Sequence, residues 1–254
     1  MHCLGFPYCH NMTRTLIVGS CLFAQSTAFD MIKIRNLLCL CVLLTAASLQ
    51  AGATAYSAKP ITATVVDAET GQPIEGVNVV AHSVLHGPTW VSAADLELTE
   101  AVTDKDGRFH IPGWGPKSIP SELPRGTRLG NSDPGLIFFK SGYEVTGLFN
   151  RLQPERLRPE HDIPVRYSDW DGKVIKLNRF RGDPQSFGVG GSIGRGIECH
   201  WKRVPRFYVA QMREKARLEA LGVRSFLPTL AHFENYFKNS GCGSAEQFFR
   251  EYLR

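Results

Sequence analysis

The chain has 254 residues, of which 43% are hydrophobic and 21% are charged, and its formal net charge is +5. This length allows one or two domains with a sizeable core. Much of the positive charge lies in residues 202–254, where no dense run of Lys and Arg occurs. We therefore expect a solvated helical surface there and no nucleic-acid partner.

The N-terminal part has the pattern of an export signal. Lys33 and Arg35 precede an apolar run at 37–49, and small residues at 51–55 follow it. This order is typical of a signal peptide, and the apolar run is short for a membrane span. We expect a periplasmic or secreted protein of a Gram-negative-type bacterium, whose mature chain begins near Tyr56 and meets the membrane only transiently, during export. The alternative is a retained N-terminal anchor.

Strand and turn signals begin after this segment. β-Branched residues predict strands at Ile61–Val66 and Val77–Ala81. The intervening Asp67–Pro73 is a turn, because Gly71 can take a positive φ and Pro73 cannot continue a central ladder.

A second turn is predicted at Thr103–Phe109, where Asp104 or Asp106 can act as the cap and Gly107 can close the turn. The Asp-Lys-Asp-Gly order is similar to the start of a calcium loop, but the later ligands of such a loop are missing. Turn chemistry explains these residues, so we expect no calcium.

The two turns together carry a family resemblance. V-D-A-E-T-G-Q-P-I-E-G-V-N-V at 66–79, followed by T-D-K-D-G-R-F at 103–109, resembles the carboxypeptidase regulatory-like domain. The resemblance covers roughly 61–177, including Gly142-Tyr143 and the strand residues of 172–177. It implies a small antiparallel, prealbumin-like β-sandwich. It also implies an accessory or binding module, because carboxypeptidase catalysis does not occur in that domain.

The rest of the sandwich region is less regular. Residues 82–100 are expected to be an insertion, and the proline-rich 112–134 is expected to be a loop. A buried strand followed by a turn is predicted at 135–145. Residues 150–169 are polar and loop-like, and 174–177 form a closing strand.

Helical signals dominate the C-terminal part. A helix is predicted from Pro205 to about Gly222. Residues Phe226, Leu230, Phe233 and Phe237 fall on one helical stripe. A capping box at Ser244 and Gln247 precedes a last helix. These helices are too small to bury their own core, so we expect them to pack on the sandwich.

These signals predict a mainly β protein, an antiparallel prealbumin-like or Ig-like β-sandwich with a small C-terminal α-helical appendix. The expected segments are an extension upstream of the true start codon at 1–30, a signal peptide at 31–55, the β-sandwich at 56–181, a flexible glycine-rich connector at 182–202 and the helical appendix at 203–254. Only Cys199 and Cys242 remain after removal of the leader, and in an exported protein they are expected to form a disulfide.

Histidines and two related enzyme families are the possible sources of catalysis. His82, His86 and His110 with a carboxylate suit zinc, but the first two straddle a predicted strand end and need not converge. Transthyretin-like hydroxyisourate hydrolases resemble the same turn motifs, yet Thr64 stands where they carry a catalytic histidine.

Intradiol dioxygenases are similar around Arg158-Pro-Glu-His161, but Ile163 stands where the second histidine belongs. A missing ligand normally breaks such an iron site. We therefore expect no enzyme, no catalytic residue, no cofactor and no bound metal.

Tryptophans are the candidate contact residues. Trp90 and Trp114 lie in predicted loops, where an exposed indole can stack on a sugar ring or anchor a partner. The alternative is that they cap the sandwich core. The leading hypothesis is a non-catalytic exported interaction module for an unknown protein or cell-envelope polymer. The alternatives are a carbohydrate-binding module and an enzyme with an altered transthyretin-like or dioxygenase-like site.

Overall fold

The computed structural model describes residues 55–151, 165–187, 193–194, 197, 199–237 and 240–253. The chain divides into two units, Met1–Gly52 and Ala53–Arg254, and the second contains every element described below. The predicted upstream extension and all but the last residue of the predicted signal peptide lie outside the described residues. So do Arg158, His161 and Ile163.

The second unit is mainly β, as predicted. Its strands are β1 (Ala55–Ala58), β2 (Ile61–Asp67), β3 (Asn78–His86), β4 (Ser92–Val102), β5 (Arg108–Ile111), β6 (Trp114–Ser118), β7 (Arg128–Leu129), β8 (Gly135–Phe139), β9 (Thr146–Leu148), β10 (Val165–Arg166) and β11 (Val174–Leu177). They form three sheets with the orders β10-β1-β6, β11-β2-β5 and β4-β3-β8-β9, and β7 pairs with β3.

Two of the sheets enclose an apolar core. Inward residues of β2, β5 and β11 pack against those of β3 and β8, as expected for a sandwich. The core residues are Ile61, Ala63, Val65, Ile74, Val77, Val79, Ala81, Phe109, Ile111, Leu136, Phe138, Ile175 and Leu177. Most ladders are antiparallel, but β11 pairs with β2 and β10 with β1 in parallel. A parallel pair needs a long crossover, and the whole β3–β8 sheet lies between β2 and β11 in sequence.

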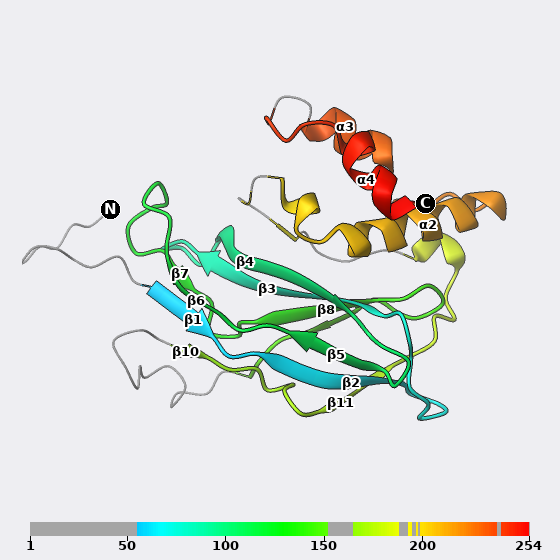
Figure 1. Ribbon diagram of the computed structural model, residues 1–254, viewed down its shortest axis with the longest axis horizontal. Helices are drawn as coiled ribbons and strands as arrows, with labels where there is room; N and C mark the ends of the chain where they lie inside the picture. Colours follow the sequence, from blue (N-terminus) through cyan, green and yellow to red (C-terminus); the bar gives the residue numbers. More distant parts are fainter. Residues whose placement is uncertain are drawn as a thin grey trace, which may run out of the picture. The chain divides into compact units, whose positions relative to one another are not determined.

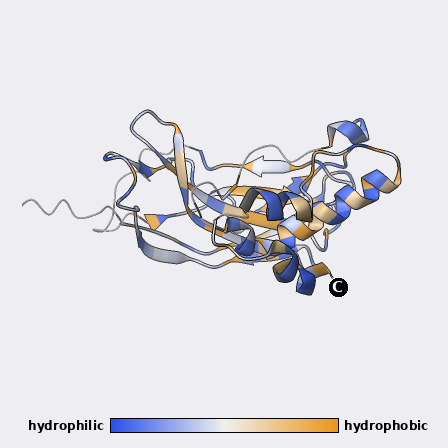
Figure 2. Ribbon diagram, turned by 90° about the horizontal axis from the view of Figure 1, so that it is seen from above, coloured by the Kyte–Doolittle hydropathy of each residue, from blue (hydrophilic) through white to orange (hydrophobic). Residues whose placement is uncertain are grey.

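Helices cover the other face of the β4-β3-β8-β9 sheet (Figure 1). They are the 3-10 helices η3 (Pro184–Ser186) and η4 (His200–Lys202) and the α-helices α2 (Pro205–Ala220), α3 (Leu230–Phe237) and α4 (Ala245–Leu253). Hydrophobic residues alternate with hydrophilic ones along the helices, as Figure 2 shows. Phe207 of α2 packs on Phe139 of β8 with ring centroids 6.0 Å apart. The appendix therefore shares a core with the sandwich.

The predicted connector is part of this core where the structure describes it. Phe187, Ile193 and Trp201 are buried there with the helices. The glycines of this segment predicted flexibility. The burial of these three apolar side chains stabilises the segment against the helices, and the glycine content alone gives no sign of this packing.

The predicted insertion at 82–100 is instead part of the longest hairpin. Asn78 pairs with Val102, and the ladder continues to His86 and Ser92. Only residues 87–91 form a loop. Asp95 and Glu97 are buried within β4. Because charged residues are unusual at buried strand positions, the sequence did not predict a strand here.

Candidate functional site

The tip of the β3–β4 hairpin presents an exposed indole. Trp90 is 52% exposed and Val91 is 64% exposed. The backbone of Trp90 has φ 62°, a left-handed conformation that is uncommon for a bulky residue. The turn is held by a hydrogen bond from the Trp90 amide to the Gly87 carbonyl at 2.9 Å.

One side of the Trp90 ring is supported by the protein itself. The Arg128 guanidinium lies 4.0 Å from the ring centroid, a cation–π contact. The imidazole Nδ1 of His86 lies 3.3 Å from the Trp90 carbonyl oxygen. Strained backbone persists where the surrounding structure holds it, and such positions cluster at binding sites. The tip can therefore offer a preorganised aromatic contact.

Trp114 occupies a different environment. It begins β6, is partly buried, and packs on a small cluster that includes Tyr56 and Leu85. The Lys117 ammonium lies 5.9 Å from its ring centroid. Trp114 also lines a pocket, together with Lys59 and Glu97 among others. The two predicted loop tryptophans thus differ, since one is an exposed tip and the other mainly completes a core.

The three histidines do not come together. His110 on β5 is exposed, and its Nδ1 lies 3.0 Å from Thr62 Oγ1. His86 contacts Trp90, whereas His82 is buried beside Asp95. Within the ranges that the structure describes, no group of three or more His, Cys, Asp or Glu could hold a metal ion.

Two further positions named in the sequence analysis, Thr64 and Asp104, lie in regular local structure. Thr64 pairs with Arg108 on β5 and with Val174 on β11. The Asp104 carboxylate accepts hydrogen bonds from the Asp106 amide at 2.9 Å and the Arg108 amide at 2.8 Å. Asp104 therefore caps the turn before β5.

A buried polar cluster was not found by sequence reasoning. His82 Nδ1 lies 3.6 Å from Asp95 Oδ1. Asp133, which precedes β8, accepts a hydrogen bond from the Val84 amide at 3.0 Å. Arg166 on β10 interacts electrostatically with Asp133. His82, Asp95 and Asp133 are each at least nine-tenths buried. They come from separate segments, so no sequence spacing could reveal the cluster.

The environment of Asp133 favours its neutral form. Burial raises the pKa of this carboxyl from 3.8 to about 7. The Val84 amide and the charges of His82 and Arg166 act in the opposite direction, while Asp95 adds to the rise. Perturbed acids of this kind are enriched at functional sites, although structural networks also contain them.

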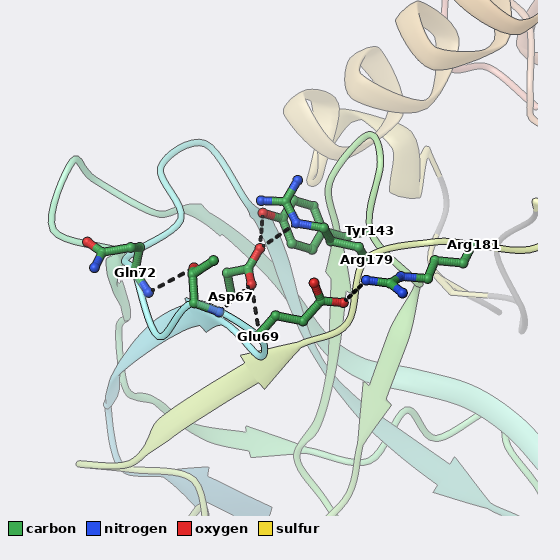
Figure 3. Close-up of polar contacts among 7 residues, drawn as sticks. Asp67, Glu69, Gln72, Tyr143, Arg179 and Arg181 are labelled. Atoms are coloured by element: carbon green, nitrogen blue, oxygen red, sulfur yellow. Dashed lines mark hydrogen bonds and ion pairs between the residues drawn. The ribbon is translucent and has the colours of Figure 1, made fainter.

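The Asp67 turn that carries the family resemblance is a second polar centre (Figure 3). The Asp67 carboxylate accepts hydrogen bonds from the amides of Glu69 at 2.9 Å and Thr70 at 3.0 Å and from the Tyr143 hydroxyl at 2.9 Å. Arg179 Nε lies 2.8 Å from Asp67 Oδ2. The Thr70 amide, and then the other hydrogen bonds and Arg179, outweigh burial and lower the pKa of Asp67 to about 2.

These contacts give Asp67 a structural role. It joins the turn after β2 to Tyr143, which follows β8, and to Arg179, which follows β11. Arg181 extends the network to Glu69 at 2.5 Å. Because both carboxylate oxygens of Asp67 are engaged, the motif fixes three chain segments.

Acidic side chains of the sandwich region also position the appendix. Glu100 of β4 accepts hydrogen bonds from the amides of Arg206 at 3.0 Å and Phe207 at 2.9 Å, at the start of α2. It satisfies amides that the helix leaves unpaired. Burial raises the pKa of Glu100, although both amides oppose the rise. The Glu97 carboxylate pairs with Arg203 at 2.9 Å.

The two cysteines expected to pair form a disulfide. Cys199 lies just before η4 and Cys242 just before α4, and their Cα atoms are 5.5 Å apart. The bond links the end of the connector to the segment that precedes the last helix. Among the residues described, no helix has the length and hydropathy of a membrane span.

No protein-family model and no curated protein matches the chain. Weak structural similarity exists to 3-chlorocatechol 1,2-dioxygenase from Rhodococcus opacus 1CP, with 16% identity over 52% of this chain and 63% of that chain and a TM-score of 0.27. A mutant catechol 1,2-dioxygenase from Acinetobacter radioresistens has 17% identity over 56% of each chain and a TM-score of 0.26. A 9R-lipoxygenase from Cyanothece PCC8801 has 14% identity over 85% of this chain and 35% of that chain, with a TM-score of 0.25.

These similarities support no functional conclusion. The chain spans less than two thirds of the length of the two dioxygenases. The low identities and TM-scores also fall below the level at which a shared activity can be argued.

Proposed function

We propose that this chain is a non-catalytic, exported interaction module of the carboxypeptidase regulatory-like type. It binds a protein or a cell-envelope polymer in the periplasm or outside the cell. The observation that carries the proposal is the hairpin tip, where Trp90 is half exposed in a left-handed backbone conformation. The disulfide supports the location, because such bonds persist in oxidising compartments.

The tip has the properties of a binding hot spot. An indole offers a large contact area and few rotatable bonds, so its ordering on binding costs little. Arg128 already holds one side of the ring, which leaves less conformational freedom to lose. Val91 adds an apolar neighbour that is mostly exposed.

A carbohydrate polymer is the second candidate, because Trp90 is an exposed indole of the kind that stacks on sugar rings. Trp114 does not extend this surface into an exposed pair, since it is partly buried and packs on the Tyr56 cluster. A single stacking residue suits a polymer that offers many equivalent sites better than a single free sugar.

The experiment is co-sedimentation of the purified protein with peptidoglycan and with other insoluble polysaccharides. Trp90→Ala should weaken binding roughly 30-fold, the equivalent of a hot-spot loss of about 2 kcal/mol. Phe226→Ala is the matched control, because Phe226 is an aromatic side chain that is 89% exposed in the appendix.

Equal loss of binding in both variants would contradict a site at the tip. If the wild-type protein did not sediment with any of the polymers, a polymer partner would be excluded and a protein partner would remain.

A further inference from the structure

The buried cluster contains polar atoms whose hydrogen-bonding capacity is unused. These atoms are His82 Nδ1 and Nε2, Asp95 Oδ2, Asp133 Oδ2 and Arg166 Nε. Folded proteins leave few buried polar atoms unpaired, because each one costs free energy. Among the described residues, five of the six such atoms lie in this cluster.

The charges of the cluster do not balance when both carboxyls are ionised. Asp95 and Asp133 then carry two negative charges, and Arg166 supplies one positive charge. A proton held by Asp133 restores neutrality, which a buried site favours strongly.

Other ionisable groups also approach the cluster. His86 Nε2 and Asp133 Oδ2 both lie close to Gly130. The Arg166 guanidinium lies 5.3 Å from the Tyr56 ring centroid. His200 of η4 and Tyr208 of α2 interact electrostatically with Asp95.

The cluster is shielded by closely fitted chain segments. A Cβ on Gly135 would lie 2.6 Å from His82 Nε2 and 2.8 Å from Phe149 Cε1. The Phe149 ring centroid is 6.1 Å from that of His82. Only glycine at 135 allows β8 to approach the imidazole this closely, and water is kept away from it.

Asp133 connects the cluster to the loop before β8. Its carboxylate accepts from the Val84 amide of β3, and its backbone carbonyl accepts from Asn150 Nδ2 at 2.6 Å. The Gly130 amide donates to the Val84 carbonyl at 3.0 Å. The protonation state of Asp133 thus acts at the point where residues 128–134 attach to β3.

We propose that the buried Asp133 holds one dissociable proton, and that this proton controls how firmly residues 128–134 are attached to β3. The ionised carboxylate is a stronger acceptor for the Val84 amide, but burial without water disfavours it more than its partners favour it. Opening of the segment, which hydrates the carboxylate, therefore becomes easier as pH rises. Arg128 lies in the same stretch and stacks on Trp90. The pH dependence therefore extends to the hairpin tip, a consequence that rests on the proposed function.

The sign follows from the linkage between protonation and folding. Burial raises the pKa of Asp133 to about 7, above the ordinary carboxyl value of 3.8. Between these values the folded chain holds a proton that the unfolded chain releases. The contribution of this group to stability is therefore complete below about pH 4 and is lost as pH rises to about 7.

The test compares the thermal unfolding of the wild type and Asp133→Asn from about pH 5 to about pH 8. The amide oxygen of the substituted side chain can still accept from Val84, but this side chain cannot ionise. The readout is the Tm of the variant minus the Tm of the wild type. This difference should increase by roughly 5–10 °C between about pH 5 and about pH 8. The control variant Asp106→Asn changes an exposed turn residue, so its Tm should depend on pH in the same way as that of the wild type.

Two further measurements make the test decisive. His82→Gln should shift the wild-type transition to higher pH, because the charge of His82 favours ionised Asp133. Hydrogen exchange at the Gly130 amide, corrected for the intrinsic rate, should quicken between about pH 6 and about pH 8 in the wild type and stay constant in Asp133→Asn. A Tm difference that does not change with pH would overturn the proposal. None of these measurements needs a binding partner, so they remain informative if the proposed function fails.

Discussion

Removal of the disulfide should destabilise the appendix severely. The perturbation is the double variant Cys199→Ala/Cys242→Ala, in which the sequence separation closed by the bond is 43 residues. The chain-entropy model gives a loss of roughly 4 kcal/mol for a loop of this length. Such a loss is a large share of the roughly 5–15 kcal/mol that is typical of a folded domain.

The structure shows which contacts should loosen. Trp201 follows Cys199 closely, and its ring centroid lies 5.5 Å from that of Phe249 in α4. Without the bond, α4 is held to Trp201 by packing and to α2 by the hydrogen bond from Arg213 to the Tyr252 carbonyl at 3.0 Å. The appendix should therefore unfold at lower denaturant concentration than the sandwich.

The assay is urea unfolding followed by circular dichroism in the far ultraviolet, which reports the helices. The oxidised wild type, the reduced wild type and the double variant are compared. The reduced wild type and the double variant should have the same free energy of unfolding. Both values should be roughly 4 kcal/mol below that of the oxidised wild type. A loss below about 1 kcal/mol would refute the reasoning, because the remaining contacts would then fix the appendix unaided.

Three further changes test how the turns and the appendix are held. Glu100→Ala should cost about 1 kcal/mol in chemical denaturation, because two amides at the start of α2 lose their acceptor; an unchanged midpoint would contradict that capping role. Gly107→Ala should cost at least about 1 kcal/mol, since φ is +71° there and the added Cβ would meet the Val65 carbonyl oxygen; equal stability would show that the turn adapts. Because the pKa of Asp67 is lowered to about 2, its stabilising contribution is present above about pH 4 and is lost as pH falls towards about 2. Tyr143→Phe should make this acid-dependent loss smaller, and an identical acid profile would argue against the Tyr143 hydrogen bond.

Local patterns were sufficient to predict much of the fold. The β-branched run from Ile61, the turn glycine at 107 and the apolar run from Gly135 each specify their own structure, because neighbouring residues determine it. The helix from Pro205 and the capping serine at 244 were equally local signals. Ser244 Oγ indeed accepts from the Gln247 amide at 3.2 Å.

Features that depend on tertiary contacts could not be predicted this way. Asp95 and Glu97 made β4 unlike a strand, although Asp95 contacts His82 and Glu97 pairs with Arg203 in the folded chain. The parallel pairing of β11 with β2 also depends on contacts between distant segments. Trp90 was identified from its glycine and proline neighbours, but its partner Arg128 comes from a distant part of the chain.

The most direct test of the binding hypothesis is site-specific photo-crosslinking in cells that export the protein. A benzophenone amino acid replaces Val91, which is 64% exposed beside Trp90, in one variant and Phe226 in a matched control. The account predicts a discrete adduct from position 91, absent from position 226 and diminished by Arg128→Ala, because that guanidinium supports the Trp90 ring. Absence of any adduct at 91, or the same adducts from both positions, would contradict a partner-binding site at the hairpin tip.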